Sequence, residues 1–465
     1  MQTARKPAPD LLRELNVWHA IAIVAGTIIG SGIFRVPGEM MKDVGSAGLV
    51  YLVWIVGGLL SFAGALTYAE LGAIKPWAGG EYIYVRDAYG PLPGFLYAWT
   101  WFLIAKPASI ATVTTGLVDV LGTVPQLSFL NSRLFTLHFT RASAFEITNG
   151  TLVAIAATVL ISALNYIGVR KAGSFQLIFT ALKVVMIVAI MFVGFTAAQG
   201  SWGNFHTTFL GAKGGMAGFM AALVAALWAY DGWNDLNMVS GEISNPGRNI
   251  PIALIAGVAL VAFLYMGINA AVQYVMPASM IAGAKVPASA ATQIAIGSAG
   301  AALVSIGMAF SMFVTLNGTI MSGGRVPFAV ARDGYFFKAL GEVHPRFHTP
   351  ALAIVVQAIM AIVLLLVGGA FKDLFSLAIF AEWLFYMIAA STIFVFRYRE
   401  PDLPRPYRTW GYPVVPAVFI LVAAALLYYT FMDNLRNSFV GTLVILAGVP
   451  VYLYFAARKR AAGPN

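Results

Sequence analysis

Long apolar runs recur along almost the whole chain and constrain its fold more than any other feature. Each has roughly 20 residues, the length of an α-helix that crosses the ~30 Å hydrocarbon core of a bilayer. The chain is 60% hydrophobic and only 10% charged, a balance far from that of soluble globular proteins. The sequence therefore predicts an all-α polytopic membrane protein. We place its twelve transmembrane helices near residues 16–36, 47–72, 92–119, 147–169, 174–198, 216–239, 250–275, 297–322, 351–369, 373–396, 412–432 and 437–457.

The net charge of +10 would suit a polyanionic partner, but the positions of the basic residues explain it more simply. If the N-terminus is cytoplasmic, most of the 29 lysines and arginines fall in cytoplasmic tails and loops, which is the positive-inside pattern. We therefore expect a multi-pass protein of the cell (inner) membrane with both termini cytoplasmic and no nucleic-acid partner. The chain has no cysteine, which excludes a disulfide-linked subunit.

The first predicted span contains helix-weakening residues, in the sequence GTIIGSGIF at residues 26–34. A break in a membrane helix is tolerated where its freed backbone groups face protein or a water-filled cavity, so a break marks a site. Close helix packing through Gly26 and Gly30 is an equally good explanation of this motif alone.

The sixth predicted span carries its own interruption, ALWAYDGWND at residues 226–235. Breaks in the first and sixth spans open two successive sets of five helices. This spacing is typical of inverted-repeat transporters, whose site lies where the two broken helices meet near the midplane.

Other functional classes lack support in the sequence. The five histidines have no metal-ligand spacing, and no nucleotide-binding or catalytic nucleophile motif is present. A membrane-embedded enzyme or receptor is the competing class, and it would need a catalytic cluster, a metal set or an added soluble domain. We therefore expect a protein that is not an enzyme and that has no cofactor and no metal.

Five motifs, in order along the chain, resemble one known family. They are GTIIGSGIF, AGGEYIYVRDAYG at residues 78–90, FTALK at 179–183, WAYDGWNDLNMVSGEISNPGRNIP at 228–251 and REPDLPRPYRTWGYP at 399–413. Together they resemble the amino acid, polyamine and organocation superfamily, and within it the L-type amino acid transporter family in a bacterial-type form.

The resemblance implies a LeuT-like fold, with five plus five inverted helices in which helices 1 and 6 are broken. The chain would form a single transmembrane transporter domain, residues 1–465. Its first five-helix repeat would cover residues 12–200, its second 215–400, and two peripheral helices 410–457. The resemblance also implies alternating-access transport of a small-molecule amino acid substrate across the lipid bilayer.

A zwitterionic amino acid needs donors for its carboxylate and acceptors for its ammonium, and a broken helix offers both. We expect the amides of Gly30, Ser31 and Gly32 to hold the carboxylate. Carbonyls around Thr27, Ile28 and Trp228 would hold the ammonium. The resemblance implies that Trp228 also acts as a gate on the extracellular side, whereas Tyr230 either lines the pocket or packs beside it.

Lys183 lies about nine residues into the fifth predicted span, roughly 13 Å deep at 1.5 Å per residue. A lysine near the bilayer centre costs on the order of 2.5–3.5 kcal/mol. Sodium-coupled proteins of the wider fold hold a cation between helices 1 and 8, and the Lys183 ammonium would replace that ion, near carbonyls of residues 26–29 and Ser311, Thr315 or Asn317. This coupling role predicts sodium independence. A lysine that is only structural is the alternative.

Asp231 lies in the second break and decides the charge of the substrate. Amides at residues 232–234 would satisfy its carboxylate locally as a helix cap, which we favour. The alternative is a counter-ion for the side chain of a cationic amino acid. Lys106 and Glu382 are further intramembrane charges, and the sequence assigns no role to either.

The sequence thus predicts a sodium-independent secondary transporter, an exchanger of neutral L-amino acids that works by alternating access. A proton-coupled amino acid symporter is the first alternative. An exchanger that also accepts cationic amino acids is the second.

Overall fold

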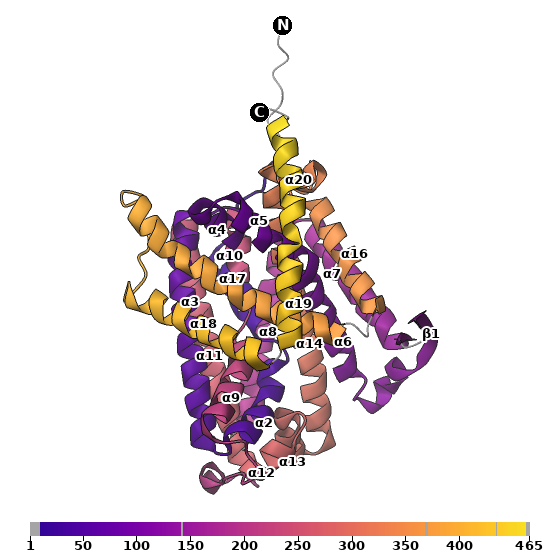
Figure 1. Cartoon of the computed structure of the whole chain (residues 1–465). Helices are drawn as coiled ribbons and strands as arrows, with labels where there is room; N and C mark the ends of the chain where they lie inside the picture. The colour runs from indigo at the N-terminus through magenta and orange to yellow at the C-terminus, as the bar shows by residue number, and fades with distance from the viewer. Residues whose placement is uncertain (1–9, 141–142, 368–370, 434, 462–465) are drawn as a thin grey trace.

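The computed structural model describes residues 10–140, 143–367, 371–433 and 435–461. In this part of the chain, eight helices are long and apolar enough to cross a membrane, and the pair α1 (Val17–Ile28) and α2 (Gly32–Val44) forms a further span bent by 41°. Most helices run roughly along one axis of the molecule (Figure 1). The helical membrane fold expected from the apolar runs is therefore confirmed.

The first set of helices follows the predicted spans closely. After α1 and α2 come α3 (Ala47–Ile74), α4 (Glu81–Tyr89), α5 (Pro91–Thr100), η1 (Trp101–Ala105), α6 (Lys106–Leu121), η2 (Pro125–Asn131), α7 (Asn149–Tyr166), α8 (Val169–Phe195) and η3 (Trp202–His206). Between η2 and α7 an antiparallel hairpin, β1 (Arg133–Thr140) and β2 (Ser143–Thr148), extends from the helices at one side of the molecule (Figure 1). No pattern in the sequence predicted this hairpin.

The second set begins with the broken span. Its helices are α9 (Gly215–Ala229), α10 (Asp235–Met238), η4 (Ser240–Glu242), α11 (Pro246–Val275), α12 (Ala278–Gly283), α13 (Pro287–Ile296), α14 (Ser298–Gly323), α15 (Arg325–Arg332), η5 (Lys338–Gly341), α16 (Ala351–Val367) and α17 (Phe371–Arg399). Residues 368 and 369, the end of the ninth predicted span, lie outside the described residues.

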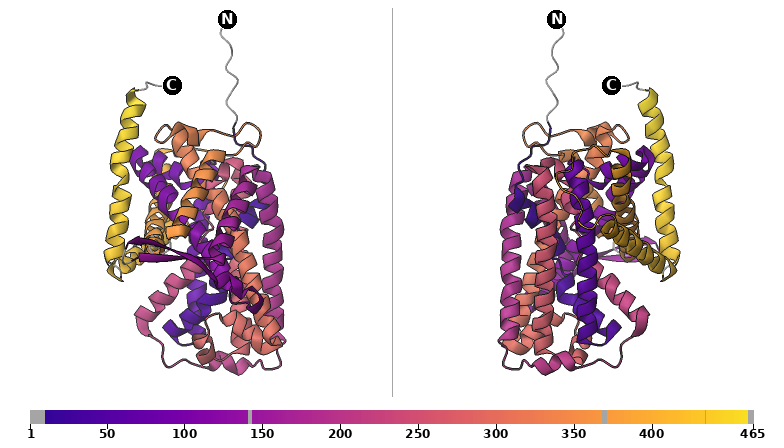
Figure 2. Two further views of the ribbon diagram at one scale, coloured as in Figure 1. Left: turned by 90° about the vertical axis from the view of Figure 1, so that its right-hand side faces the viewer. Right: turned by 90° about the vertical axis from the view of Figure 1, so that its left-hand side faces the viewer.

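Three helices complete the described chain: α18 (Val414–Asp433), α19 (Leu435–Leu446) and α20 (Gly448–Ala461). Figure 2 shows α20 along one flank of the bundle. Helix is present in all twelve predicted runs, although twelve membrane crossings, the two repeats and the residue limits of the domain stay predictions.

The two breaks lie against each other in the interior. A Cβ placed on Gly32, the first residue of α2, would be 3.0 Å from the Cβ of Ala229, the last residue of α9. Gly232 in the second break has a φ of +106°, a backbone conformation that favours glycine, and a Cβ there would lie 2.9 Å from Thr27. Glycine is therefore required where the first and second breaks touch.

The α1 helix is held by three long neighbours, since it packs against α8, α11 and α14. It begins after Asn16, whose side chain accepts hydrogen bonds from the amides of Trp18 and His19, a standard N-cap. Just before it, the Leu15 amide donates to the Glu242 carbonyl at 2.9 Å and the Ser244 amide donates to the Leu15 carbonyl at 2.8 Å. The start of α1 is thus tied to the segment that follows α10.

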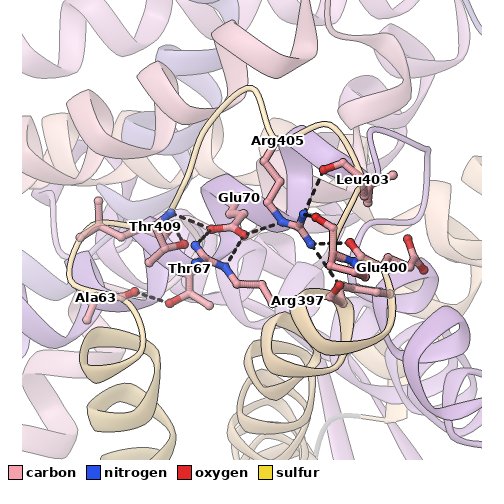
Figure 3. Close-up of polar contacts among 11 residues, drawn as sticks. Ala63, Thr67, Glu70, Arg397, Glu400, Leu403, Arg405 and Thr409 are labelled. Carbon is pink, nitrogen blue, oxygen red and sulfur yellow. Dashed lines mark hydrogen bonds and ion pairs between the residues drawn. The ribbon is translucent and has the colours of Figure 1, made fainter.

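Buried ion pairs join the helices near the start of α1. The fully buried Arg325 guanidinium contacts both carboxylate oxygens of Glu242, at 2.8 and 3.0 Å. Glu70 of α3 accepts from Arg397 at 2.9 and 2.6 Å and from the Thr409 amide at 2.7 Å, and Arg405 clamps the loop after α17 (Figure 3). Arginine paired in this bidentate way fixes geometry as well as charge.

Both described ends of the chain also meet here. Arg332 at the end of α15 pairs with Asp10 at 3.0 Å, and the Lys459 ammonium of α20 donates to the Asp333 carbonyl at 2.6 Å. The two ends of the described chain therefore lie on one side of the bundle, the side that the ion pairs hold together.

Candidate substrate site

A cavity of about 130 Å³ lies where the two breaks meet. Helices α6, α14 and α17 complete its wall. The lining residues are Thr27, Ile28, Gly30, Ser31, Gly32, Lys106, Ser109, Thr112, Val113, Trp228, Ala229, Asp231, Gly232, Asn234, Asp235, Met312, Thr319, Glu382 and Tyr386. All five first-break residues predicted from the sequence thus line one cavity with Trp228 and Asp231.

The first break presents uncharged backbone groups. Within the described residues, the amides of Gly30 and Ser31 have no hydrogen-bond acceptor, and the Ser31 side chain makes no capping bond to α2. Unpaired amides at the start of a helix are donors suited to an anion. A Cβ on Gly30 would have no atom nearer than 3.9 Å, so this glycine leaves open space beside the two amides.

Some backbone carbonyls of the two breaks already accept hydrogen bonds from protein side chains, and others do not. The Tyr265 hydroxyl of α11 lies 3.1 Å from the Ile28 carbonyl oxygen and 2.9 Å from that of Ala229. Tyr265 thereby links the two broken helices. The Thr27 carbonyl has no partner in the described part of the chain, so it stays available to an ammonium group.

Lys183 does not line the cavity and lies behind the first break. Its side chain is fully buried, and Nζ donates to the carbonyls of Gly26 and Ile29 at 2.7 and 2.8 Å and to Thr315 Oγ1 at 3.1 Å. Ser311 also donates to the Ile29 carbonyl, at 2.8 Å. The resemblance implied contacts of Lys183 with these carbonyls and with Ser311, Thr315 or Asn317; of these three residues Thr315 contacts the ammonium, whereas Asn317 joins Asn165 and Gln176.

The second break brings charged side chains into the cavity. Lys106 of α6 forms an ion pair with Asp235 of α10, and the two side chains are 7% and 1% exposed. The Tyr386 hydroxyl of α17 donates to Asp231 Oδ1 at 3.0 Å. The sequence favoured a cap from the amides of residues 232–234 for Asp231; the Gly232 amide does act on its carboxylate, and Tyr386 adds a donor from another helix.

Lys106 and Glu382 are cavity residues to which the sequence analysis gave no role. The signal was a charge inside a predicted span, which by default marks a functional site. Lys106 also follows directly on η1, a π-helical turn, and such turns are frequent at functional sites. The chemistry of this wall is therefore more ionic than the motif of the first break suggests.

The two aromatic residues predicted for the site lie in different surroundings. Trp228 lines the cavity with 39% of its surface exposed. For Tyr230 the sequence left open whether it lines the pocket or packs beside it. It is outside the lining: its ring is buried against Trp54 and Tyr265, with centroids 5.5 and 5.1 Å away. Tyr230 therefore supports the second break from behind.

Comparison with known proteins agrees with this architecture. Residues 15–457 match the family model described as amino acid permease. The chain is 32% identical to the serine/threonine exchanger SteT of Bacillus subtilis, over 97% of this chain and 98% of that protein. It is also 32% identical to the b(0,+)-type amino acid transporter 1 of Mus musculus and to the large neutral amino acids transporter small subunit 2 of Homo sapiens, over 97% and 95% of this chain and 89% and 80% of those proteins.

These relatives are named as amino acid transporters or exchangers and not as enzymes. The match covers both broken spans, the wall helices α6, α14 and α17, and almost all of the described helices. This chain therefore belongs to the amino acid permease family, as the order of its five sequence motifs predicted.

Proposed function

We propose that this protein is a sodium-independent exchanger of neutral L-amino acids. The observation that carries the proposal is the position of the Lys183 ammonium, which bridges the Gly26 and Ile29 carbonyls of the first break and Thr315 of α14. A cation bound there would need these same oxygens. Because a protein ammonium already uses them, the first break needs no sodium ion to hold its shape.

The substrate would lie across the break with its carboxylate on the amides of Gly30, Ser31 and Gly32. Its ammonium would contact the free carbonyl of Thr27, with Ile28 and Trp228 completing the acceptor side. The cavity volume of about 130 Å³ is below the ~300–1,000 Å³ of pockets for larger ligands, which is in line with a single free amino acid. The relative named as a serine/threonine exchanger is in line with this size.

The orientation follows from the charge pattern and from the ends of the described chain. Arg332 and Asp333 contact both ends, and this side carries the basic loops assigned to the cytoplasm by the positive-inside rule. We therefore propose that both termini lie in the cytoplasm and that the protein resides in the cell (inner) membrane. Trp228 would then cover the substrate from the extracellular side.

Reconstituted protein tests the proposal directly. Liposomes loaded with alanine, serine or leucine should take up labelled external alanine much faster than empty liposomes, and replacing sodium by choline should change nothing. Uptake that requires sodium contradicts the role of Lys183. Uptake that is equally fast into empty liposomes contradicts exchange.

A proton-coupled symporter is the second candidate, because Lys183 has no carboxylate partner among the described residues and a buried ammonium can release its proton. An inward proton gradient would then drive alanine into empty liposomes. Exchange without symport gives no such uptake, so the same preparation separates the two mechanisms.

A further inference from the structure

Glu382 is a cavity carboxylate that the binding scheme above leaves unused. It lies on α17, lines the cavity and is partly buried. Within the described residues no donor lies within hydrogen-bond distance of its side chain, and it belongs to no ion pair. Its neighbour one turn along the helix, Tyr386, turns its hydroxyl to Asp231 instead.

The charged groups around Glu382 do not neutralise its negative charge. Lys106 of α6, Asp231 of the second break, Asp235 of α10 and Glu81 of α4 are close enough to act on its charge. Lys106 is already paired with Asp235, whose second oxygen, Oδ2, is buried and has no hydrogen-bond partner in the described part of the chain. The one ammonium is thus shared by an excess of carboxylates.

Glu81 is the best satisfied of these acids and lies outside the lining. Tyr97 donates to it at 2.6 Å and Asn234 at 2.9 Å. The unmet negative charge is therefore on the cavity side, between Glu382 of α17 and Asp231 of the second break.

The excess of carboxylates at the cavity matters in a transporter that works by alternating access. During each cycle the cavity is closed on both sides, and a carboxylate without a cation at the middle of a membrane is costly. A positive charge must therefore enter the cavity before it closes. Among the described residues, Lys106 is the one lysine that lines the cavity, so the charge comes with the substrate or from the solvent.

We propose that Glu382 takes up one positive charge with each substrate: the cationic end of a basic amino acid, or a proton when the substrate is neutral. The proposal rests on the proposed exchange of amino acids. Glu382 is thus a charge-selecting residue that lets one cavity accept both substrate classes. Its carboxylate receives the proton from the solution on the side where a neutral substrate enters and returns it on the side where that substrate leaves.

Exchange between the two classes then moves no net charge. A basic amino acid that enters carries its own positive charge, and the neutral amino acid that leaves is accompanied by a proton. Net proton movement would therefore occur only in such mixed exchange, because in exchange between two neutral substrates the protons moved in the two directions cancel.

Proton counting on substrate binding tests this inference. Ornithine and norleucine have the same length and differ only in a terminal ammonium or methyl group. Calorimetric titration of the purified protein in buffers of different ionisation enthalpy gives the number of protons taken up with each. We expect the uptake of about one more proton per site with norleucine than with ornithine. The Glu382 carboxylate must bind a proton when it becomes neutral, and linkage makes this proton part of the binding reaction.

The Glu382→Gln variant should remove the difference in proton count, because its amide does not titrate, and should weaken ornithine binding on the order of tenfold relative to norleucine. Glu400→Gln is the matched control: Glu400 follows the end of α17 and pairs with Lys75 at 3.1 Å, outside the cavity. It should keep the wild-type counts. A melting curve of each variant reports folding independently.

Equal proton counts for the two ligands in the wild type overturn the inference. So does a one-proton difference that persists in Glu382→Gln, or wild-type protein that binds norleucine but not ornithine. In each of these cases alanine counterflow in liposomes continues. If counterflow itself is absent, the proposed exchange fails first, and this inference fails with it.

Discussion

The two helix breaks meet at one cavity but are built from different chemistry. The first break, between α1 and α2, lines the cavity with residues 27–28 and 30–32, none of which is charged, and the Lys183 ammonium is fully buried behind it. The second break carries Asp231 and, at the start of α10, Asp235. Every amino acid has the same carboxylate and ammonium, whereas side chains differ. The uncharged first break therefore suits the carboxylate and ammonium that all amino acids share. The charged second break suits the side chain, which varies.

The largest effect is expected from Gly30→Val in the first break. A Cβ there meets no atom nearer than 3.9 Å, so the valine side chain begins in open space and fills the space beside the Gly30 and Ser31 amides. Loss of hydrogen bonds to a carboxylate, at about 1.5–3 kcal/mol each, should weaken alanine binding at least ~100-fold. Isothermal titration of alanine measures it.

Gly48→Val is the control for this change, since a Cβ at Gly48 on α3 also meets open space but far from the cavity. Its alanine affinity should equal that of the wild type. Normal binding by Gly30→Val would place the carboxylate elsewhere and remove the basis of the comparison.

Lys183→Ala tests what keeps the first break in shape. The variant deprives the Gly26 and Ile29 carbonyls of a shared donor but also removes a desolvated charge, so the melting temperature should change little. Exchange turnover should fall by about tenfold or more. Lys171→Ala, an exposed lysine on the same helix, should leave turnover unaffected, and wild-type turnover in Lys183→Ala would reduce Lys183 to a structural residue.

Asp231→Asn sharpens the role of the second break. The asparagine oxygen still accepts from Tyr386, whose hydroxyl lies 3.0 Å from Asp231 Oδ1, while the negative charge is lost. We expect competition by ornithine to weaken about tenfold more than competition by alanine. Equal losses for both ligands would show that Asp231 only supports the break.

The smallest effect is expected from Trp228→Ala. The ring covers one side of the cavity while 39% of its surface stays exposed, so it contributes contact area and no charge. Alanine affinity should fall about fivefold, equivalent to about 1 kcal/mol, mainly through faster dissociation. Stopped-flow binding separates the two rates, and an unchanged dissociation rate would speak against a gate.

The sequence predicts what depends on local pattern. Runs of apolar residues located all twelve helical regions, and glycines in two of them located both breaks. Lys183 was informative because a lone lysine at that depth requires carbonyl partners nearby in the fold. These predictions rest on hydrophobic length and on the cost of unpaired groups, both of which are properties of single segments.

The ionic wall of the cavity could not be predicted in this way. Lys106 and Asp235 are 129 residues apart in the chain, and Tyr386 reaches Asp231 from another helix. Such pairings depend on how α6, α10 and α17 rotate about their axes when they pack, which the sequence pattern does not specify. The exclusion of Tyr230 from the cavity has the same cause, since its neighbours Trp54 and Tyr265 come from α3 and α11.

The position of a bound substrate tests the division between the two breaks most directly. A structure determined with ornithine should show its carboxylate oxygens within about 3.0 Å of the Gly30 and Ser31 amides, as charge-assisted hydrogen bonds require. Its side-chain ammonium should lie between Asp231 and Glu382. A carboxylate bound at the second break beside Lys106, with the side chain toward the first, would contradict the account.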